Sequence, residues 1–236
     1  MNRPIIGISS NFQPHKGEQG LYSVDRSYVD AVYATGGLAQ VIPILPNDEI
    51  PQLIAMYDGI LLSGGGGLLP HVKKMSSLPN LEKQSPHRYT FEYALIQEAF
   101  HKNIPLLGVC RGHQMINAVK GGTIKNLPSD DHNQTEPTDV PSHSIDVKSH
   151  SKLLSYVKKT SLSVNSIHNQ VIDQVGTGLT INALSSEGYI EGIESENDHF
   201  VLGVQFHPEL MIQQKEMFLI YKKFIQAAIK YRQTKD

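Results

Sequence analysis

The sequence predicts an α/β fold in which one domain is built on a mostly parallel central sheet flanked by helices. Short apolar runs alternate with amphipathic stretches through the first half of the chain, and Gly or Pro ends most of the runs. Strands of a parallel sheet are buried on both faces and read as continuous apolar runs, with helices connecting them. With 236 residues, 39% of them hydrophobic, the chain can form one large core, so we expect a single domain over residues 1–236.

The first half supplies the alternating strands and helices in order. Strands are expected at the apolar runs 4–10, 38–44, 57–67 and 104–109. Helices are expected around Tyr28, Val29, Val32 and Tyr33, which recur at helical spacing before two glycines, and at 50–56 and 88–103. A further helix is expected to begin near Gly112.

The second half is less regular. Residues 126–144 are polar and rich in Pro, Asp and Ser, which predicts a surface loop close to a functional site. Shorter alternating segments follow at 144–147, 162–167, 179–185 and 200–206, and a long helix is expected at 215–232. The sequence contains no internal repeat and no low-complexity tract.

Charge and composition exclude several classes of protein. The net charge is −2, and Lys and Arg are spread along the chain, so nucleic acid is not expected as a partner. The first residues do not resemble a signal peptide, and no segment approaches the roughly 20 apolar residues of a membrane span. The only cysteine cannot form an internal disulfide. We therefore expect a soluble, cytoplasmic protein that does not bind membranes.

That cysteine, Cys110, lies in the pattern G-x-C-x-G, with Gly108 and Gly112 on either side. The pattern is typical of a nucleophile elbow, in which a strand turns sharply into a helix and projects the side chain at the turn. The amides of the first helical turn would then favour thiolate over thiol. The alternative is that Cys110 is a small buried apolar residue.

A candidate general base lies in the segment VLGVQFHPEL. Pro208 disfavours helix at His207, and in an extended segment Glu209 would share a face with His207. The order predicts a triad in which Cys110 attacks, His207 moves the proton and Glu209 orients the ring. The alternative is that these residues only form a turn after a buried strand.

Together, LLGVCRGHQMINAVKGG and GVQFHPE resemble the class I glutamine amidotransferase-like superfamily, and within it the gamma-glutamyl-gamma-aminobutyrate hydrolase family of gamma-glutamyl cysteine peptidases. The opening IGIS, YVDAVYATGGLAQVIP, LLSGGGGLLP and VNSIHNQ extend the likeness over most of the chain. The resemblance implies a flavodoxin-like sheet, hydrolysis of a small gamma-glutamyl compound through a thioester, and a place in polyamine catabolism. It implies no cofactor and leaves a homodimer open.

The resemblance also implies an oxyanion hole formed by the backbone amides of Gly65 and Arg111. The alternative use of the glycine run, binding a dinucleotide, is disfavoured because Leu69 stands where G-x-G-x-x-G needs its third glycine. By resemblance, Gln114, His168 and Gln170 would bind substrate. From the residues alone, His168 could equally form local hydrogen bonds, and Gln114 could cap the helix.

The chain departs from the family pattern at Gly67, Leu68, Asn169 and Phe206. We expect these departures to affect the leaving-group side of the pocket and not the triad.

His143, His150, Asp131 and His132 are possible metal ligands by residue type. No pair has the spacing of H-E-x-x-H, and thiol chemistry needs no metal, so no metal site is expected.

Three functions remain in view. The first is a hydrolase that releases an amine such as gamma-aminobutyrate from a gamma-glutamyl compound. The second is a glutaminase subunit that delivers ammonia to a separate synthetase. The third is a catalytically silent binding protein, which the retention of Cys110, His207 and Glu209 argues against.

Overall fold

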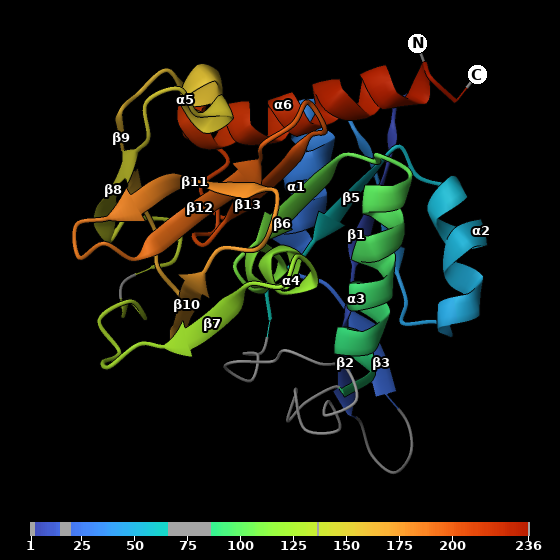
Figure 1. Ribbon diagram of the computed structural model, residues 1–236, viewed down its shortest axis with the longest axis horizontal. Coiled ribbons are helices and arrows are strands. Elements are labelled where there is room, and N and C mark those ends of the chain that lie inside the picture. Colours follow the sequence, from blue (N-terminus) through green and yellow to red (C-terminus); the bar gives the residue numbers. More distant parts are fainter. Residues whose placement is uncertain (1–2, 15–19, 66–85, 136, 236) are drawn as a thin grey trace.

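The computed structural model describes residues 3–14, 20–65, 86–135 and 137–235. Its central element is an eleven-stranded sheet, accompanied by the two-stranded hairpin of β2 and β3 (Figure 1). The described strands are β1 (Ile5–Ser9), β2 (Asn11–Pro14), β3 (Gly20–Ser23), β4 (Leu38–Ile42), β5 (Gly59–Leu62), β6 (Leu106–Val109), β7 (Thr123–Asn126), β8 (His143–Val147), β9 (Ser161–Val164), β10 (Gln170–Gln174), β11 (Leu179–Ser185), β12 (Ile190–Ser195) and β13 (Val201–Val204).

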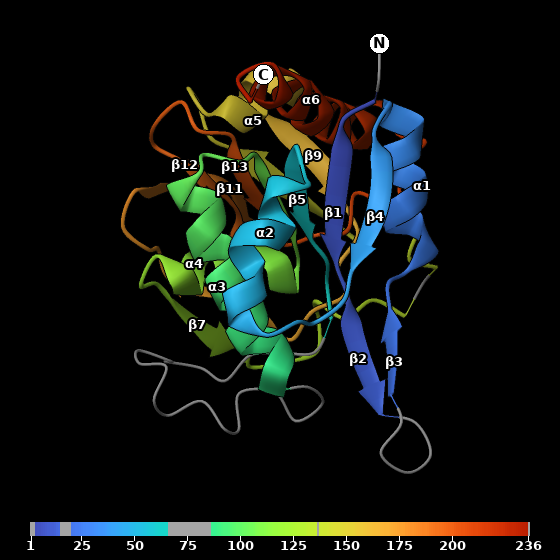
Figure 2. The same ribbon diagram turned by 90° about the vertical axis from the view of Figure 1, so that its right-hand side faces the viewer.

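Helices cover both faces of the sheet. Those described are α1 (Arg26–Thr35), α2 (Ile50–Ala55), α3 (Pro86–His101), α4 (Arg111–Val119), α5 (Lys152–Val157) and α6 (Lys215–Arg232), with a 3₁₀ turn η1 at Asn47–Glu49. Figure 2 shows α1 on one side of β1 and β4, and α2 and α3 on the other. Contacts join α1 and α5 to α6 on the first face, and α3 to α2 and α4 on the second. Each face therefore encloses its own apolar core.

Half of the sheet is parallel. Strands β4, β1, β5, β6 and β13 are neighbours in that order, and all four pairings are parallel. Each of β1, β5 and β6 is a short, largely buried apolar run, as expected for strands covered on both faces. The predicted α/β class is confirmed.

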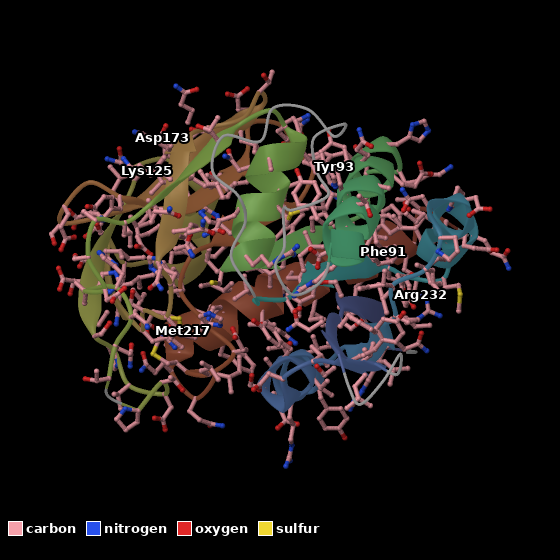
Figure 3. The ribbon with its side chains drawn as sticks, turned by 90° about the horizontal axis from the view of Figure 1, so that it is seen from below. Phe91, Tyr93, Lys125, Asp173, Met217 and Arg232 are labelled. Carbon is pink, nitrogen blue, oxygen red and sulfur yellow. The ribbon has the colours of Figure 1, made fainter. Side chains whose placement is uncertain are left out.

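The other half is antiparallel, which the sequence did not predict. From β13 the sheet continues through β12, β11, β8 and β9, and β10 joins β12 to β7. The sheet is therefore mixed and not mostly parallel. Figure 3 shows Lys125 on β7 beside Asp173 on β10, where Nζ and Oδ1 are 3.5 Å apart. Strands β7, β10 and β12 lie in stretches for which no strand was expected, because their apolar patterns are short and irregular.

Local signals explain where the helices begin and end. The Asp25 side chain accepts a hydrogen bond from the Ser27 amide at the start of α1, and Gly36, with φ of 103°, ends it. The Ser151 side chain caps α5 in the same way, through the Leu154 amide. The predicted helix at 215–232 coincides with α6, which crosses one end of the molecule in Figure 1. None of the described helices is long and apolar enough to cross a bilayer.

Candidate active site

Cys110 lies at the junction between β6 and α4. Its backbone has φ of 50° and ψ of −104°, a conformation that is rare for a residue with a side chain. The turn is tight because α4 approaches the sheet closely: a Cβ on Gly112 would lie 2.3 Å from the carbonyl oxygen of Leu62. The G-x-C-x-G segment thus forms the strained strand-to-helix elbow that the sequence predicted. Cys110 is also 94% buried. It therefore lies at an elbow, as expected for a nucleophile, and is buried, as expected for an apolar core residue.

His207 reaches the same end of the sheet on the neighbouring strand. Strand β13 pairs with β6 in parallel, and the Cys110 amide donates to the Val204 carbonyl at 2.8 Å. Both chain segments therefore leave the carboxyl ends of adjacent strands, where ligands bind in open α/β sheets. Asn165 holds the backbone of His207 through two hydrogen bonds, one accepted from the His207 amide at 2.8 Å and one donated to its carbonyl at 3.0 Å.

The imidazole of His207 is paired with Glu209. Nδ1 and Oε1 lie 2.6 Å apart, and the Glu209 carboxylate is buried. The segment is a turn after β13, in which the Leu210 amide donates to the His207 carbonyl. The sequence offered a turn as the alternative to a triad, and here the turn itself brings the two side chains together.

The protonation of His207 depends on its neighbours. Burial disfavours the charged ring. The Coulombic attraction of Glu209 and of Cys110, together with side-chain hydrogen bonds to both, outweighs burial and raises the pKa of His207 well above 6.5. An imidazolium next to a thiol favours the thiolate. This arrangement can deliver both a sulfur nucleophile and a proton donor.

Two glutamines form a chain behind the sulfur. Gln205 Nε2 donates toward Cys110 Sγ at 3.6 Å. Its Oε1 accepts a hydrogen bond from Gln114 Nε2 at 3.0 Å, and Gln114 Nε2 also donates to the Gln170 carbonyl at 3.0 Å. The side-chain Nε2 of Gln114 is therefore already hydrogen-bonded to protein atoms. Its bond to Gln205 Oε1 turns the Nε2 of Gln205 toward the sulfur.

A buried ionic cluster supports the glycine loop after β5. Glu92 accepts hydrogen bonds from Arg88 and Arg111, and all three side chains are almost fully buried. Burial raises the pKa of Glu92, but attraction to Arg111 and then to Arg88 more than reverses this and lowers the pKa. Arg88 also donates to the carbonyls of Ser63 and Gly64, at 3.0 and 3.1 Å.

Gly65 is held within this framework. Its φ is 148°, and a Cβ there would lie 2.3 Å from Arg88 Nη1 and 2.7 Å from Asn11 Oδ1. The preceding amide, of Gly64, donates to the Tyr28 hydroxyl at 2.8 Å, whereas no described residue accepts from the Gly65 amide. Arg111 is the first residue of α4, so its amide belongs to the helix N-terminus. Gly65 and Arg111 both line the cavity that Cys110 lines, and the oxyanion role of their amides stays a prediction.

Two adjoining cavities meet at Cys110 and His207. One, of about 320 Å³, is lined by Cys110 and by five residues with amide side chains, Gln114, Asn126, Asn133, Asn169 and Gln170. The other, of about 340 Å³, is lined by His207, Glu209, Asp25, Tyr28 and Asn11. Gly65 and Ile167 line both cavities, so a substrate that spans them would pass the sulfur. A larger hollow, of about 440 Å³, lies at the amino ends of β6 and β13, away from these groups.

The predicted substrate residues reach the first cavity, although their polar atoms are engaged. His168 Nε2 lies 3.1 Å from Ser166 Oγ, and Nδ1 lies 3.2 Å from the Gln170 carbonyl. Burial, followed by the charges of nearby histidines, lowers the pKa of His168 to about 3, so its ring is neutral. Gln170 Nε2 donates to Asn126 Oδ1 at 2.8 Å. Their contact with substrate stays a prediction.

The residues that depart from the family pattern lie in different parts of the structure. Asn169 lines the same cavity as Gln114 and His168, and its effect on the leaving group stays a prediction. Phe206 is fully buried in the core and lines neither cavity, which removes it from the residues that shape the pocket. Gly67 and Leu68 lie outside the described residues.

Sequence reasoning missed several members of this site. Gln205, Tyr28, Arg88 and Glu92 were seen only as parts of a strand or helix pattern. The spacing of Arg88 and Glu92, four residues apart on one helix, signals an ion pair. It could not show that Arg111 and the glycine loop complete the cluster.

The chain is similar in sequence and in fold to several known proteins. Residues 4–209 match the family model described as Peptidase C26. The chain is 35% identical to a Schizosaccharomyces pombe protein named "Putative glutamine amidotransferase", over 95% of this chain and 87% of that one. It is 29% identical to the gamma-glutamyl-gamma-aminobutyrate hydrolase of Escherichia coli, over 89% and 87%. A glutamine amidotransferase structure from Thermotoga maritima superposes with a TM-score of 0.62 at 15% identity, covering 98% of both chains, and so supports the fold.

Proposed function

This chain belongs to the peptidase C26 family of glutamine amidotransferase-like hydrolases, and from that premise we propose that it cleaves the gamma-glutamyl amide bond of small gamma-glutamyl compounds through a thioester on Cys110. The observation that carries the proposal is the strained elbow of Cys110 beside the His207–Glu209 pair, at the junction of two cavities. The E. coli relative named as a gamma-glutamyl-gamma-aminobutyrate hydrolase supports the choice of substrate class.

The first half of the reaction forms the thioester. The thiolate of Cys110 attacks the gamma-carbonyl carbon, and the carbonyl π electrons move onto oxygen. The amides of Gly65 and Arg111 stabilise this oxyanion, which is where preorganised donors contribute most. The imidazolium of His207 then gives its proton to the amine nitrogen, the C–N bond breaks, and the amine leaves.

The second half regenerates the enzyme. Neutral His207 takes a proton from a water molecule, and the resulting hydroxide attacks the thioester carbon. The C–S bond breaks, the new carboxyl group releases its proton to solvent, glutamate leaves, and the sulfur returns as a thiolate beside imidazolium. Glu209 keeps Nδ1 of the ring protonated throughout, so Nε2 faces the reacting groups. No cofactor takes part in these steps.

We place the two halves of the substrate in the two cavities. Five asparagine and glutamine residues line the first cavity, and side-chain amides can both donate to the alpha-carboxylate and accept from the alpha-amino group of a glutamyl unit. The second cavity would take the amine half. Removing the alpha-amino group should then reduce kcat/KM by a factor on the order of 10² or more, because buried partners would be left unpaired.

Hydrolysis by the purified chain alone tests the proposal. The assay measures glutamate release from gamma-glutamyl-gamma-aminobutyrate, other gamma-glutamyl amides, their des-amino analogues and L-glutamine, with Cys110→Ala as the blank. The proposal expects the gamma-glutamyl amides to be cleaved at least tenfold more efficiently than glutamine. Cleavage of glutamine alone would favour a glutaminase subunit that serves a separate synthetase. Cleavage of none would favour a silent binding protein.

A further inference from the structure

A second group of titratable side chains lies behind the wall of the first cavity. It consists of His132, His143, His168 and Glu191, which we call the histidine–glutamate cluster. The four residues come from four separate segments: the loop after β7, the start of β8, the loop before β10, and β12. Two of them, His132 and His143, were weighed as metal ligands from the sequence. The other two, His168 and Glu191, come from distant segments that only the fold brings to them.

Glu191 is the centre of the cluster. Its side chain is fully buried, and neither carboxylate oxygen has a hydrogen-bond partner among the described residues. Its Oε1 faces three imidazole nitrogens, at 3.7 Å from His143 Nε2, 3.7 Å from His168 Nε2 and 3.9 Å from His132 Nδ1. A buried carboxylate without partners is costly, so this oxygen calls for a positive charge among the imidazoles.

The geometry points to a zinc ion, and we propose that His132, His143, His168 and Glu191 bind one as a closed four-ligand site. The ligand atoms of His132, His168 and Glu191 all lie within 4.8 Å of one another. In a tetrahedral zinc site with bonds of about 2.0–2.1 Å, ligand atoms lie about 3.4 Å apart. His143 Nε2 lies 3.7 Å from Glu191 Oε1 but outside this group of three, so the His143 ring has to move toward the group to complete the tetrahedron.

The surroundings of the histidines match those of metal ligands. A ligating histidine usually donates its other ring N–H to a backbone carbonyl, a carboxylate or water, which fixes the ring and the tautomer. His168 resembles this arrangement: Nε2 lies 3.7 Å from Glu191 Oε1 and 3.1 Å from Ser166 Oγ, a contact that a bound ion would replace, and Nδ1 lies 3.2 Å from the Gln170 carbonyl. His143 similarly places Nδ1 3.4 Å from Ser142 Oγ while Nε2 faces Glu191. Three imidazoles with one carboxylate are a donor set that suits zinc.

The site would act on the structure around Cys110 rather than on the chemistry. His168 follows Ile167, whose carbonyl lies 3.9 Å from Cys110 Sγ. The His168 amide donates to the His132 carbonyl at 3.0 Å, so the two loops already run side by side. A bound ion would tie both loops to β8 and β12 and so hold the cavity wall. This inference is independent of the proposed reaction, because it concerns the fold and not turnover.

The experiment uses the full chain without a histidine tag and with Cys110→Ala, which removes zinc binding by the thiol. Protein loaded with zinc is dialysed against a weak chelator, and bound metal is measured by mass spectrometry. One zinc per chain is expected. Glu191→Gln and His143→Ala should each bind at least tenfold less zinc per chain than the Cys110→Ala parent. His150→Ala, at an exposed position outside the cluster, should bind as much zinc as the parent.

Two further measurements keep the inference falsifiable if a variant folds poorly. Cobalt(II) in place of zinc should give the strong visible absorption of a tetrahedral nitrogen and oxygen site, and EDTA should lower the Tm of the zinc-loaded protein. The inference fails if the Cys110→Ala chain retains less than a tenth of an equivalent of zinc and its Tm ignores EDTA. It also fails if Glu191→Gln and His143→Ala, both folded, retain as much zinc as the His150→Ala control.

Discussion

Nδ1 of His207 and Oε1 of Glu209 lie 2.6 Å apart, with only Pro208 between the two residues in the chain. The carboxylate holds one ring tautomer and raises the pKa of the imidazole, after burial has lowered it. Orienting a base is a smaller contribution than being the base. His207→Ala should therefore cost nearly as much kcat as Cys110→Ala, and Glu209→Ala should cost less.

Steady-state kinetics of the three variants test this ranking. Glu216→Ala is a suitable control because Glu216 pairs with Lys159 at the surface, away from the cavities. Its kcat should stay close to that of the unchanged protein. Unaltered turnover in His207→Ala would remove His207 from the triad, and a larger loss in Glu209→Ala than in His207→Ala would reverse the assigned roles.

Gln205 should contribute to the reactivity of the sulfur. It donates toward Cys110 Sγ at 3.6 Å, and Gln114 fixes its orientation. A hydrogen bond of this kind stabilises by about 1 kcal/mol, so Gln205→Leu should slow alkylation of Cys110 by iodoacetamide about fivefold at neutral pH. Gln213→Leu, at an exposed position, serves as the control. Equal alkylation rates in the two variants would show that Gln205 only fills space.

Gly65 should tolerate no side chain. Its φ of 148° is rare for other residues, and a Cβ would meet the side chains of Arg88 and Asn11. Gly65→Ala should displace the loop and reduce kcat by a factor on the order of 10²–10³, the usual cost of losing one oxyanion donor. Gly121→Ala is the matched control, since Gly121 has φ of 83° but nothing within 4 Å of the added Cβ. If kcat falls by the same factor in both variants, backbone strain explains the effect. That result would contradict the oxyanion role of Gly65.

Acid should destabilise the fold through buried neutral histidines. Burial lowers the pKa of His113 to about 3, against a backbone hydrogen bond with Gly203 that raises it. Below pH 6.5 His113 is protonated in the unfolded chain but stays neutral in the folded protein. The free energy of unfolding present above pH 6.5 therefore falls as the pH drops toward 3. The slope is about 1 kcal/mol per pH unit for each such group. His168 behaves in the same way.

Urea unfolding at pH 6 and pH 5 measures this slope. His113→Leu should lose about 1 kcal/mol less than the unchanged chain between these two pH values, because the variant has no proton to bind there. His150→Leu is the control for replacing a histidine with leucine at an exposed position. An identical slope in His113→Leu would mean that His113 is not held neutral in the fold.

The sequence predicted the parallel half of the fold well and the antiparallel half poorly. Strands β1, β5 and β6 are continuous apolar runs, and α6 has a clear helical period, so local pattern decides them. Strand β12 is fully buried although it contains Glu191, Glu194 and Ser195. Glu194 is accommodated by distant partners, because it accepts hydrogen bonds from the amides that open α5. A window of sequence cannot contain such partners.

The candidate site divides in the same way. Cys110, His207 and Glu209 carry short motifs whose geometry is set within a few residues, by an elbow and by a turn. Gln205 and Arg88 act on the site through contacts with residues 95 and 24–25 positions away in the chain. Such long-range contacts depend on the register of the sheet, which the sequence pattern did not specify.

The most direct test of the account is to identify the residue that carries the glutamyl group during the reaction. The protein is mixed rapidly with a gamma-glutamyl amide, quenched in acid within the first turnover and digested for mass spectrometry. The account predicts the mass of one glutamyl group on the peptide that contains Cys110, and neither adduct nor turnover in Cys110→Ala. A glutamyl adduct on another residue, or turnover that survives in Cys110→Ala, would contradict it.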